Sequence, residues 1–331
     1  MNLLMLDPYE ALRPLMNRYG ATCSPRDFYW AVNQAYHTVE AHQYDELHEA
    51  MFVGLEPVWH FLLSQAATHP SPKLRVLDVG AGTGLVGGFV EMHLASRVGS
   101  MTMLDPCEAM LGQCRRRAEL FSFSCDFRHG DILELGPHEQ FDLITVNSVL
   151  HHVVELPAFF ARVRTLLAPQ GWLLTAQDPR AQAASDSCLQ ARRKQWRQRH
   201  RQLARVLWSR CRQVMRRLLG PPHLSPLALE TSHQLLQQQT IRQPMTMSSI
   251  YAVTDFHVPG QPGGLGKGLD LEAMAGWLPD CVLADARTYQ FHGVPWTGLG
   301  RGEQELESQW WAARDPHGEL FASAWRRDLR P

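Results

Sequence analysis

The sequence lacks the patterns that mark membrane-spanning, secreted and metal-binding proteins. None of its apolar stretches approaches the roughly 20 residues that a helix needs to cross a bilayer. The N-terminal MNLLMLDPYE has no basic start before its short apolar run, so it does not resemble a secretory signal. The seven cysteines are dispersed and form no C-x-x-C pair, and the 16 histidines form no H-E-x-x-H pattern. We therefore expect no membrane span, no disulfide framework, no metal site, and a cytoplasmic protein.

Acidic residues are also missing from one segment. From Arg192 to Arg217 there are eleven Arg or Lys residues and no Asp or Glu, which leaves 21 basic against 33 acidic residues elsewhere. The net charge of −1 therefore combines an acidic body with one basic segment. Because an acidic body repels anionic partners, we expect nucleic acid to be an unlikely partner.

The order of the predicted elements divides the chain into four regions. Residues 1–70 have apolar side chains at helical spacing and predict a helical N-terminal cover. Residues 71–180 alternate strands with helices, which predicts an α/β fold with a parallel, doubly wound sheet. Residues 181–250 predict a basic helical insertion, or lid, after the fifth strand. Residues 251–331 are expected to complete the core sheet and to end in a tail.

The last region has the weakest pattern. YAVTDFHVPGQPGGLGKG predicts a strand-like piece and a glycine loop, LDLEAMAGWL predicts a helix, and CVLADARTYQFHG predicts a closing pair of strands. The tail contains Trp310, Trp311 and Trp325, and no element is predicted for it. Packing in the core would explain these rings, and so would the wall of an apolar substrate pocket or contact with a cationic nitrogen.

The stretch VLDVGAGTG, residues 76–84, places an acid two residues before alternating glycines. A strand, a glycine turn and a helix present free backbone N–H groups to a ligand. GTGLVG satisfies the G-x-G-x-x-G pattern of dinucleotide sites, but Asp78 would repel a pyrophosphate. A cationic ligand would gain from this carboxylate, and S-adenosylmethionine has an ammonium and a sulfonium group but no phosphate. A Walker A motif is excluded at GLGKG by Gln261 and Gly268.

From Lys73 to Pro179 the motifs resemble, in order and spacing, those of class I S-adenosylmethionine-dependent methyltransferases. The likeness is closest to the small-molecule branch typified by ubiquinone/menaquinone biosynthesis methyltransferases. It implies a Rossmann-like sheet and S-adenosylmethionine as the cofactor, but it names no substrate.

The resemblance assigns the glycine turn to the methionine end of the cofactor. Asp78 would face the methionine ammonium, and Gly80, Gly82 and Gly84 would let the backbone approach the cofactor. Tyr44 lies on the N-terminal helices, which in this family often fold over the cofactor. Asp78 could instead be only a turn residue, and Tyr44 only a packing residue.

The resemblance also assigns residues to the nucleoside end. Asp105, followed by Pro106, would take both ribose hydroxyls, for which a carboxylate offers two acceptor oxygens. Its alternative is a helix N-cap. Asp131 would bind the adenine amino group, with Ile132 against the ring. NSVLHHV, which begins at Asn147, would lie beneath the methionine part and face the substrate.

Three histidines are candidate general bases. His151 and His152 follow the fourth strand, and His257 precedes the glycine loop. Imidazole titrates near neutral pH, so any of them could accept a proton from the methyl acceptor. They could equally pack beneath the cofactor. Methyl transfer is an in-line displacement at an activated sulfonium, so alignment alone can provide much of the rate.

These observations predict methyl transfer from S-adenosylmethionine to an O or N atom of a small molecule, in specialised metabolism. One alternative is a protein that binds S-adenosylmethionine without transferring its methyl group. Another is an RNA methyltransferase, suggested only by the basic segment. NSVL stands where base-modifying relatives often carry N-P-P-[FY], and no RNA-binding module is evident.

The basic segment itself, residues 189–219, predicts one long helix. Its apolar residues recur at steps of seven, four and three, which places them in one stripe. We expect the helix to dock on the acidic body by this stripe and to border the substrate entrance. A lid, an element of a homodimer, and a membrane- or nucleic-acid-binding helix are the alternatives.

Overall fold

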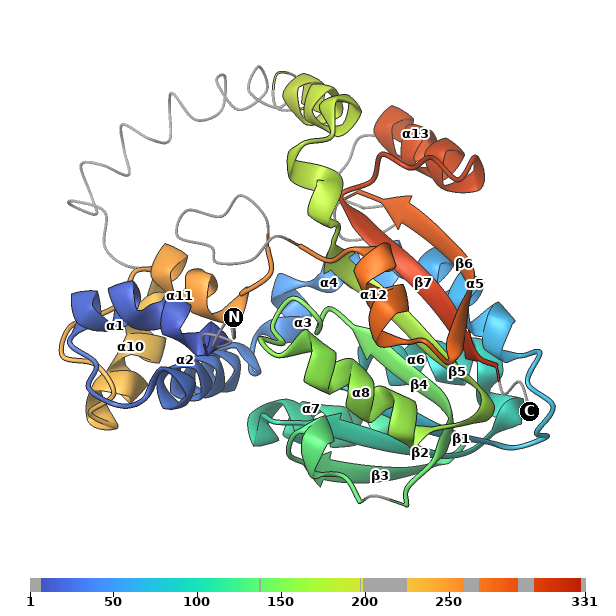
Figure 1. The fold of residues 1–331 in the computed structure, drawn as a ribbon, viewed down its shortest axis with the longest axis horizontal. Coiled ribbons are helices and arrows are strands. Elements are labelled where there is room, and N and C mark those ends of the chain that lie inside the picture. The colour runs from blue at the N-terminus through green and yellow to red at the C-terminus, as the bar shows by residue number, and fades with distance from the viewer. Residues whose placement is uncertain are drawn as a thin grey trace, which may run out of the picture.

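The computed structural model describes residues 7–136, 138–196, 198, 225–258, 268–290 and 301–328. A seven-stranded sheet of order β3-β2-β1-β4-β5-β7-β6 lies at its centre (Figure 1). The strands are β1 (Leu74–Val79), β2 (Val98–Asp105), β3 (Ser124–His129), β4 (Phe141–Asn147), β5 (Leu167–Pro179), β6 (Cys281–Tyr289) and β7 (Leu320–Arg327). The first five are parallel, and β7 lies antiparallel between β5 and β6. The predicted Rossmann-like α/β sheet is confirmed.

The parallel strands form where the sequence is continuously apolar. Every residue of β4 up to Val146 is buried, because helices cover both faces of the sheet. One face packs on α5 (Glu56–Ala66), α6 (Leu85–Leu94) and α7 (Glu108–Ala118), and the other on α8 (Leu156–Leu166) and α12 (Leu271–Trp277). Helix α5 contacts α6, β5 and β7, so this part of residues 1–70 belongs to the layer that covers the sheet.

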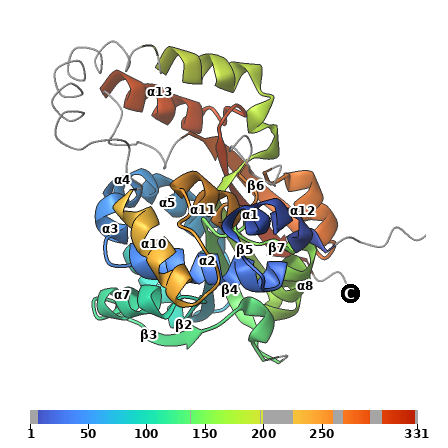
Figure 2. The same ribbon diagram turned by 90° about the vertical axis from the view of Figure 1, so that its left-hand side faces the viewer.

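Two N-terminal helices and two helices from the region after β5 pack together into a separate layer, which we call the cover. Helices α1 (Arg13–Tyr19), α2 (Pro25–Glu40), α10 (Pro226–Gln237) and α11 (Met247–Thr254) share a single apolar cluster. Figures 1 and 2 show them as a group beside one end of the sheet. The starts of α2, α10 and α11 are marked in the sequence, because Ser24, Ser225 and Thr246 each accept a hydrogen bond from a backbone N–H of the first turn.

Other described helices lie outside these two groups. They are α3 (Tyr44–Leu47), α4 (Glu49–Gly54), α13 (Arg301–Ala312), and the 3₁₀ helices η1 (Pro8–Leu12), η2 (Ala95–Arg97), η3 (Ile132–Glu134) and η4 (Ala181–Ala184). Within the described ranges, no helix combines the length and apolar character that a membrane crossing requires.

Two predictions for the last region are wrong. The strand-like piece at YAVTD is helical, because α11 begins at the cap Thr246 and buries Ile250 and Val253 against the cover. The closing pair does not lie within CVLADARTYQFHG: that segment forms β6 alone, and β7 of the tail is its partner. Trp325 of β7 is buried in the core, whereas the Trp310 ring lies against the Arg192 guanidinium, 3.8 Å from ring centroid to Cζ.

Only the start of the basic segment is described. Residues 187–196 are helical, and Leu189 is buried. Arg192 and Arg193 form ion pairs with Asp315 and Glu319 of the tail. Residues 199–219, which contain most of the apolar stripe, lie outside the described residues, so docking of the whole helix stays a prediction.

Candidate functional site

A tight glycine turn follows β1. Gly80, Gly82 and Gly84 have φ of 66°, 54° and 83°, a left-handed conformation that other L-residues rarely adopt. A Cβ on Gly80 would lie 2.3 Å from Val149 Cγ2, whereas a Cβ on Gly82 would meet only the Gly80 carbonyl oxygen at 4.0 Å. Gly80 is therefore required for space as well as for conformation.

We expect Gly80→Ala to destabilise the protein clearly more than Gly82→Ala. The left-handed conformation costs each alanine about 1–2 kcal/mol, and Gly80→Ala adds the overlap with Val149. Gly112→Ala is a matched control, because Gly112 lies within α7 with no neighbouring atom in the way, and alanine favours a helix. Chemical denaturation measures all three variants. Equal losses for the two turn variants would contradict this account of the turn.

The turn forms part of the wall of a cavity of about 410 Å³. The wall joins the carboxyl ends of β1, β2, β4 and β5 to α2 and α11 of the cover and to α3. Every residue predicted to bind the cofactor lines it except Asp78 and Gly84: Tyr44, Gly80, Gly82, Asp105, Pro106, Asp131, Ile132 and Asn147. Gly84 instead faces α7, where a Cβ would lie 3.0 Å from Cys114 Sγ.

Asp105 ends β2 at the cavity wall and is held from two sides. Its Oδ2 accepts the Gly82 N–H and its Oδ1 accepts the Cys107 N–H, both at 2.8 Å. Burial raises the pKa of Asp105. Each carboxylate oxygen has two lone pairs, so both can accept a further hydrogen bond from a ligand. Asp105 does not cap α7, because the N-cap of that helix is Cys107 and no side chain caps it. The ligand role of Asp105 stays a prediction.

Asp131 and Ile132 lie beside Asp105 on the same wall. Asp131 Oδ1 caps η3 by accepting the Leu133 N–H at 2.8 Å, and Glu134 accepts the Asp131 N–H in return. Burial raises the pKa of Asp131. The Ile132 side chain is buried and offers an apolar surface at this end of the cavity.

Asp78 does not reach the cavity wall. It pairs in register with Thr145 of β4, whose hydroxyl donates to Asp78 Oδ1 at 2.7 Å. Burial raises its pKa to about 7. Among the described residues, Asp78 Oδ2 has no hydrogen-bond partner. The strand continues through Asp78, so its side chain belongs to the sheet layer, and a contact with an ammonium group stays a prediction.

His151 lines the cavity and is paired with a buried acid. Its Nδ1 lies 2.8 Å from Oδ1 of Asp178, the fully buried residue near the end of β5. Burial acts to lower the pKa of His151, but the hydrogen bond and negative charge of Asp178 outweigh it, and the pKa is raised. A proton on Nδ1 leaves Nε2 as the acceptor. This is the arrangement of an oriented general base.

His152 has a different environment. Its Nδ1 lies 2.6 Å from the Thr254 carbonyl oxygen of α11, so Nδ1 donates and Nε2 is left as the acceptor. Burial and the neighbouring His151 and His37 hold the pKa of His152 well below its ordinary value. It is therefore neutral at physiological pH and also lines the cavity.

His257 is not among the residues that line the cavity, so its role as a base gains no support from the geometry and stays a prediction. Its backbone N–H donates to the His151 carbonyl oxygen at 2.8 Å, and its Nε2 lies 3.0 Å from the Val153 carbonyl oxygen. Burial lowers the pKa of His257. His257 therefore supports the backbone of residues 151–153 by hydrogen bonds to their carbonyl oxygens.

The sequence reasoning missed a buried acid of the cover, Glu40. It accepts a hydrogen bond from Tyr36 Oη at 2.8 Å and contacts His37 and His48 at 3.5 and 3.3 Å. Burial acts to raise its pKa, but these partners outweigh it and lower the pKa to about 2. No sequence motif marks Glu40 as a residue of the site. Asp178, by contrast, could have been found from its place at the carboxyl end of a parallel strand, where α/β sheets bind ligands.

The sequence comparisons agree with this geometry. Residues 76–171 match the family model Methyltransf_25, a methyltransferase domain. The ubiquinone biosynthesis O-methyltransferase of Rhodopseudomonas palustris (strain BisB5) is 31% identical over 104 residues, 31% of this chain and 39% of that protein. The hybrid PKS-NRPS synthetase mpsA of Macrophomina phaseolina (strain MS6) is 30% identical over 124 residues, 36% of this chain and 3% of that protein.

Among solved structures, the plantazolicin methyltransferase BpumL in complex with SAH is 11% identical, with a TM-score of 0.46 over 97% of this chain and 99% of that chain. This chain matches only 39% of the length of the Rhodopseudomonas palustris O-methyltransferase. The matched sequence, the strand order and the glycine turn together identify residues 76–171 as a methyltransferase domain of the class I, S-adenosylmethionine-dependent family.

Proposed function

We propose that this protein transfers the methyl group of S-adenosylmethionine to an O or N atom of a small molecule. One observation carries the proposal: Asp105, the residue suited to a ribose, and His151, the residue suited to a base, line the same cavity. A protein that only bound the cofactor would have no need of an oriented base beside it.

The residues of the wall fit the cofactor. Asp105 would accept both ribose hydroxyls with its remaining lone pairs, and Ile132 would lie against the adenine ring near Asp131. Trp59 Nε1 donates to Asn147 Oδ1 at 3.0 Å, which orients the amide so that its N–H groups can donate to the methionine carboxylate. When bound, S-adenosylmethionine supplies a methyl group on a cationic sulfur that is already activated for displacement.

His151 would take the proton of the acceptor. Its Nε2 accepts the proton from an O–H or N–H group as the acceptor atom is methylated, and Asp178 stabilises the imidazolium that results. Tyr36 and Tyr251 of the cover line the cavity with their ring centroids 5.9 Å apart, and we expect them to limit the access of water to the site.

The lining favours a small, uncharged or cationic acceptor. The rings of Trp30, Tyr36, Tyr44 and Tyr251 provide flat apolar surfaces, which suit an aromatic acceptor or a cationic nitrogen. Glu40, Asp105, Asp131 and Asp255 place carboxyl groups around the same space, and these would repel the phosphates of a nucleic acid. The wall thus argues against the RNA methyltransferase alternative.

We also propose a location, a metabolic role and an oligomeric state for the protein. The six cysteines that the structure describes are free thiols, which agrees with the reducing cytoplasm that we propose as the location. A role in specialised metabolism and the formation of a homodimer are likewise proposals.

The proposal is tested by following the labelled methyl group of S-adenosylmethionine. The protein is incubated with cell extract that has been separated into small-molecule, protein and RNA fractions. We expect label in a small-molecule product that is one methylene heavier by mass, together with S-adenosylhomocysteine. Label confined to RNA would support the RNA alternative. Binding of S-adenosylhomocysteine without any transfer would support the non-methylating alternative.

A further inference from the structure

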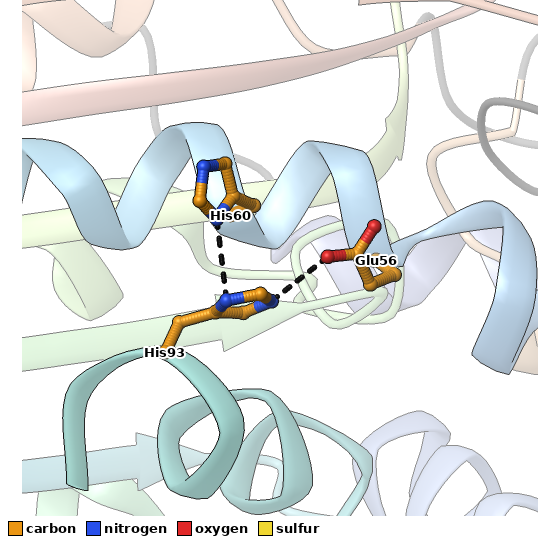
Figure 3. A group of neighbouring side chains, drawn as sticks. All are labelled: Glu56, His60 and His93. Atoms are coloured by element: carbon orange, nitrogen blue, oxygen red, sulfur yellow. Dashed lines mark hydrogen bonds and ion pairs between the residues drawn. The ribbon is translucent and has the colours of Figure 1, made fainter.

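Two histidines and a glutamate meet between α5 and α6 (Figure 3). Glu56 is the first residue of α5, and His60 lies one turn further along the same helix. His93 is the penultimate residue of α6. The contact between them joins α5 to α6, and none of the three side chains lines the cavity.

The two imidazoles approach each other edge-on, and the Nδ1 atom of each ring points toward the other ring. His60 Nδ1 and His93 Nδ1 are 3.2 Å apart, and His93 Nε2 lies 3.0 Å from Glu56 Oε1. The side chain of His93 is only 15% exposed, so its ring is held in this orientation by the two helices and by the carboxylate. Without a metal, a proton on one Nδ1 can be donated to the other Nδ1.

We propose that His60 and His93 bind a Zn²⁺ ion, or a similar transition-metal dication, between their Nδ1 atoms. Zinc binds histidine nitrogen at about 2.0–2.1 Å in tetrahedral sites. Two nitrogens 3.2 Å apart then subtend an angle of roughly 100° at the metal, close to the tetrahedral value. The separation of the two nitrogens therefore fits one metal ion, and water would complete the coordination on the exposed side of His60.

Glu56 is a positioning residue in this site. A histidine that ligates a metal usually donates its other ring N–H to a carboxylate, which fixes the tautomer and raises the basicity of the ligating nitrogen. Glu56 Oε1 lies 3.0 Å from His93 Nε2 but outside hydrogen-bond geometry, so a small rotation of either side chain would provide this arrangement. Since the three ligand-type atoms lie within 4.8 Å of one another, the carboxylate also adds negative charge beside the cation.

Occupancy of the site would tie α5 to α6. Helix α6 starts directly after Gly84 of the glycine turn, and α5 packs on the sheet, so a metal bridge would brace the layer behind the turn. Because the folded state alone brings the two histidines together, zinc should raise the melting temperature. This inference does not depend on the proposed methyl transfer.

The site is tested by titrating Zn²⁺ into the full chain after metal has been removed with a chelator. We expect one equivalent to bind the wild type, and the double variant His60→Gln/His93→Gln to bind at least 10-fold more weakly. Glu56→Gln should weaken binding about 10-fold, within the range for such supporting residues. Zinc should raise the melting temperature of the wild type but not that of the double variant.

His233→Gln is the matched control, because His233 is an exposed histidine on α10 far from the pair along the chain, and it should bind zinc as the wild type does. Binding of S-adenosylhomocysteine by the double variant checks that it is folded, and His60→Gln alone replaces it if it is not. Visible absorption of bound Co²⁺ reports the tetrahedral geometry directly. Equal zinc binding by the wild type and the histidine variants, or no binding to the wild type, would overturn the proposal.

Discussion

Replacing Asp105 with alanine is expected to weaken the binding of S-adenosylhomocysteine by at least about 10-fold, or roughly 1.4 kcal/mol. The variant loses the acceptor for the ribose hydroxyls. It also loses the two hydrogen bonds by which the carboxylate holds the Gly82 and Cys107 N–H groups. Asp105→Asn keeps the shape of the side chain but exchanges one acceptor oxygen for a donor, so a loss of similar size is expected. Titration calorimetry measures each affinity.

Asp126→Ala provides the matched control. Asp126 lies on β3, opposite Thr102 of β2, and its side chain is largely exposed and forms an ion pair with Arg128. Its removal should leave cofactor affinity unchanged. If Asp105→Ala binds S-adenosylhomocysteine as tightly as the wild type, the assignment of Asp105 to the ribose is wrong.

Removal of the His151–Asp178 pair should lower turnover by about 10²-fold or more while cofactor affinity stays within a few-fold, because general bases typically contribute 10²- to 10⁴-fold. His151→Gln deletes the base itself. Asp178→Asn keeps the size of the side chain but removes the charge that orients and supports the imidazole. Single-turnover measurement of methyl transfer, with the acceptor found in the labelling experiment, reports the chemical step.

The pH dependence has a definite direction. His151 accepts a proton only when it is neutral, so turnover should rise with pH through its pKa, which Asp178 raises above the ordinary value. Asp178→Asn removes this effect, and the rise should therefore move to lower pH in the variant. A merely structural role would lower turnover without moving the profile.

The variants His152→Gln and His257→Gln test which histidine acts as the base. His152 lines the cavity with a pKa well below the ordinary value, whereas His257 lies behind it. We expect a smaller effect from either variant than from His151→Gln. Full turnover by His151→Gln from pH 6 to 9 would show that His151 is not the base.

The sheet and the glycine turn could be predicted because their causes are local. The apolar strand, the glycines at positive φ and the following helix are consecutive in the sequence, and Asp105 and Asp131 each end a parallel strand or follow one. Parallel strands bring such ends to one edge of the sheet. The resemblance assigned Asp105 and Asp131 to one ligand, and both residues line the same cavity.

Other features depend on contacts between distant segments. Thr254 of α11 accepts from His152, and Tyr29 of α2 donates to the His152 carbonyl oxygen. The segment at YAVTD is helical because the cover buries it, although its β-branched and aromatic residues favour a strand. Likewise, the absence of an H-E-x-x-H pattern said nothing about His60 and His93, which two different helices bring together.

The central claim is that this cavity binds S-adenosylmethionine rather than a dinucleotide. Titration calorimetry of the wild-type protein with S-adenosylhomocysteine and with NAD tests it most directly. The account predicts one equivalent of S-adenosylhomocysteine bound with micromolar affinity, worth about 8 kcal/mol, and far weaker binding of NAD, whose pyrophosphate would meet the carboxyl-lined wall. Tighter binding of NAD than of S-adenosylhomocysteine would contradict it.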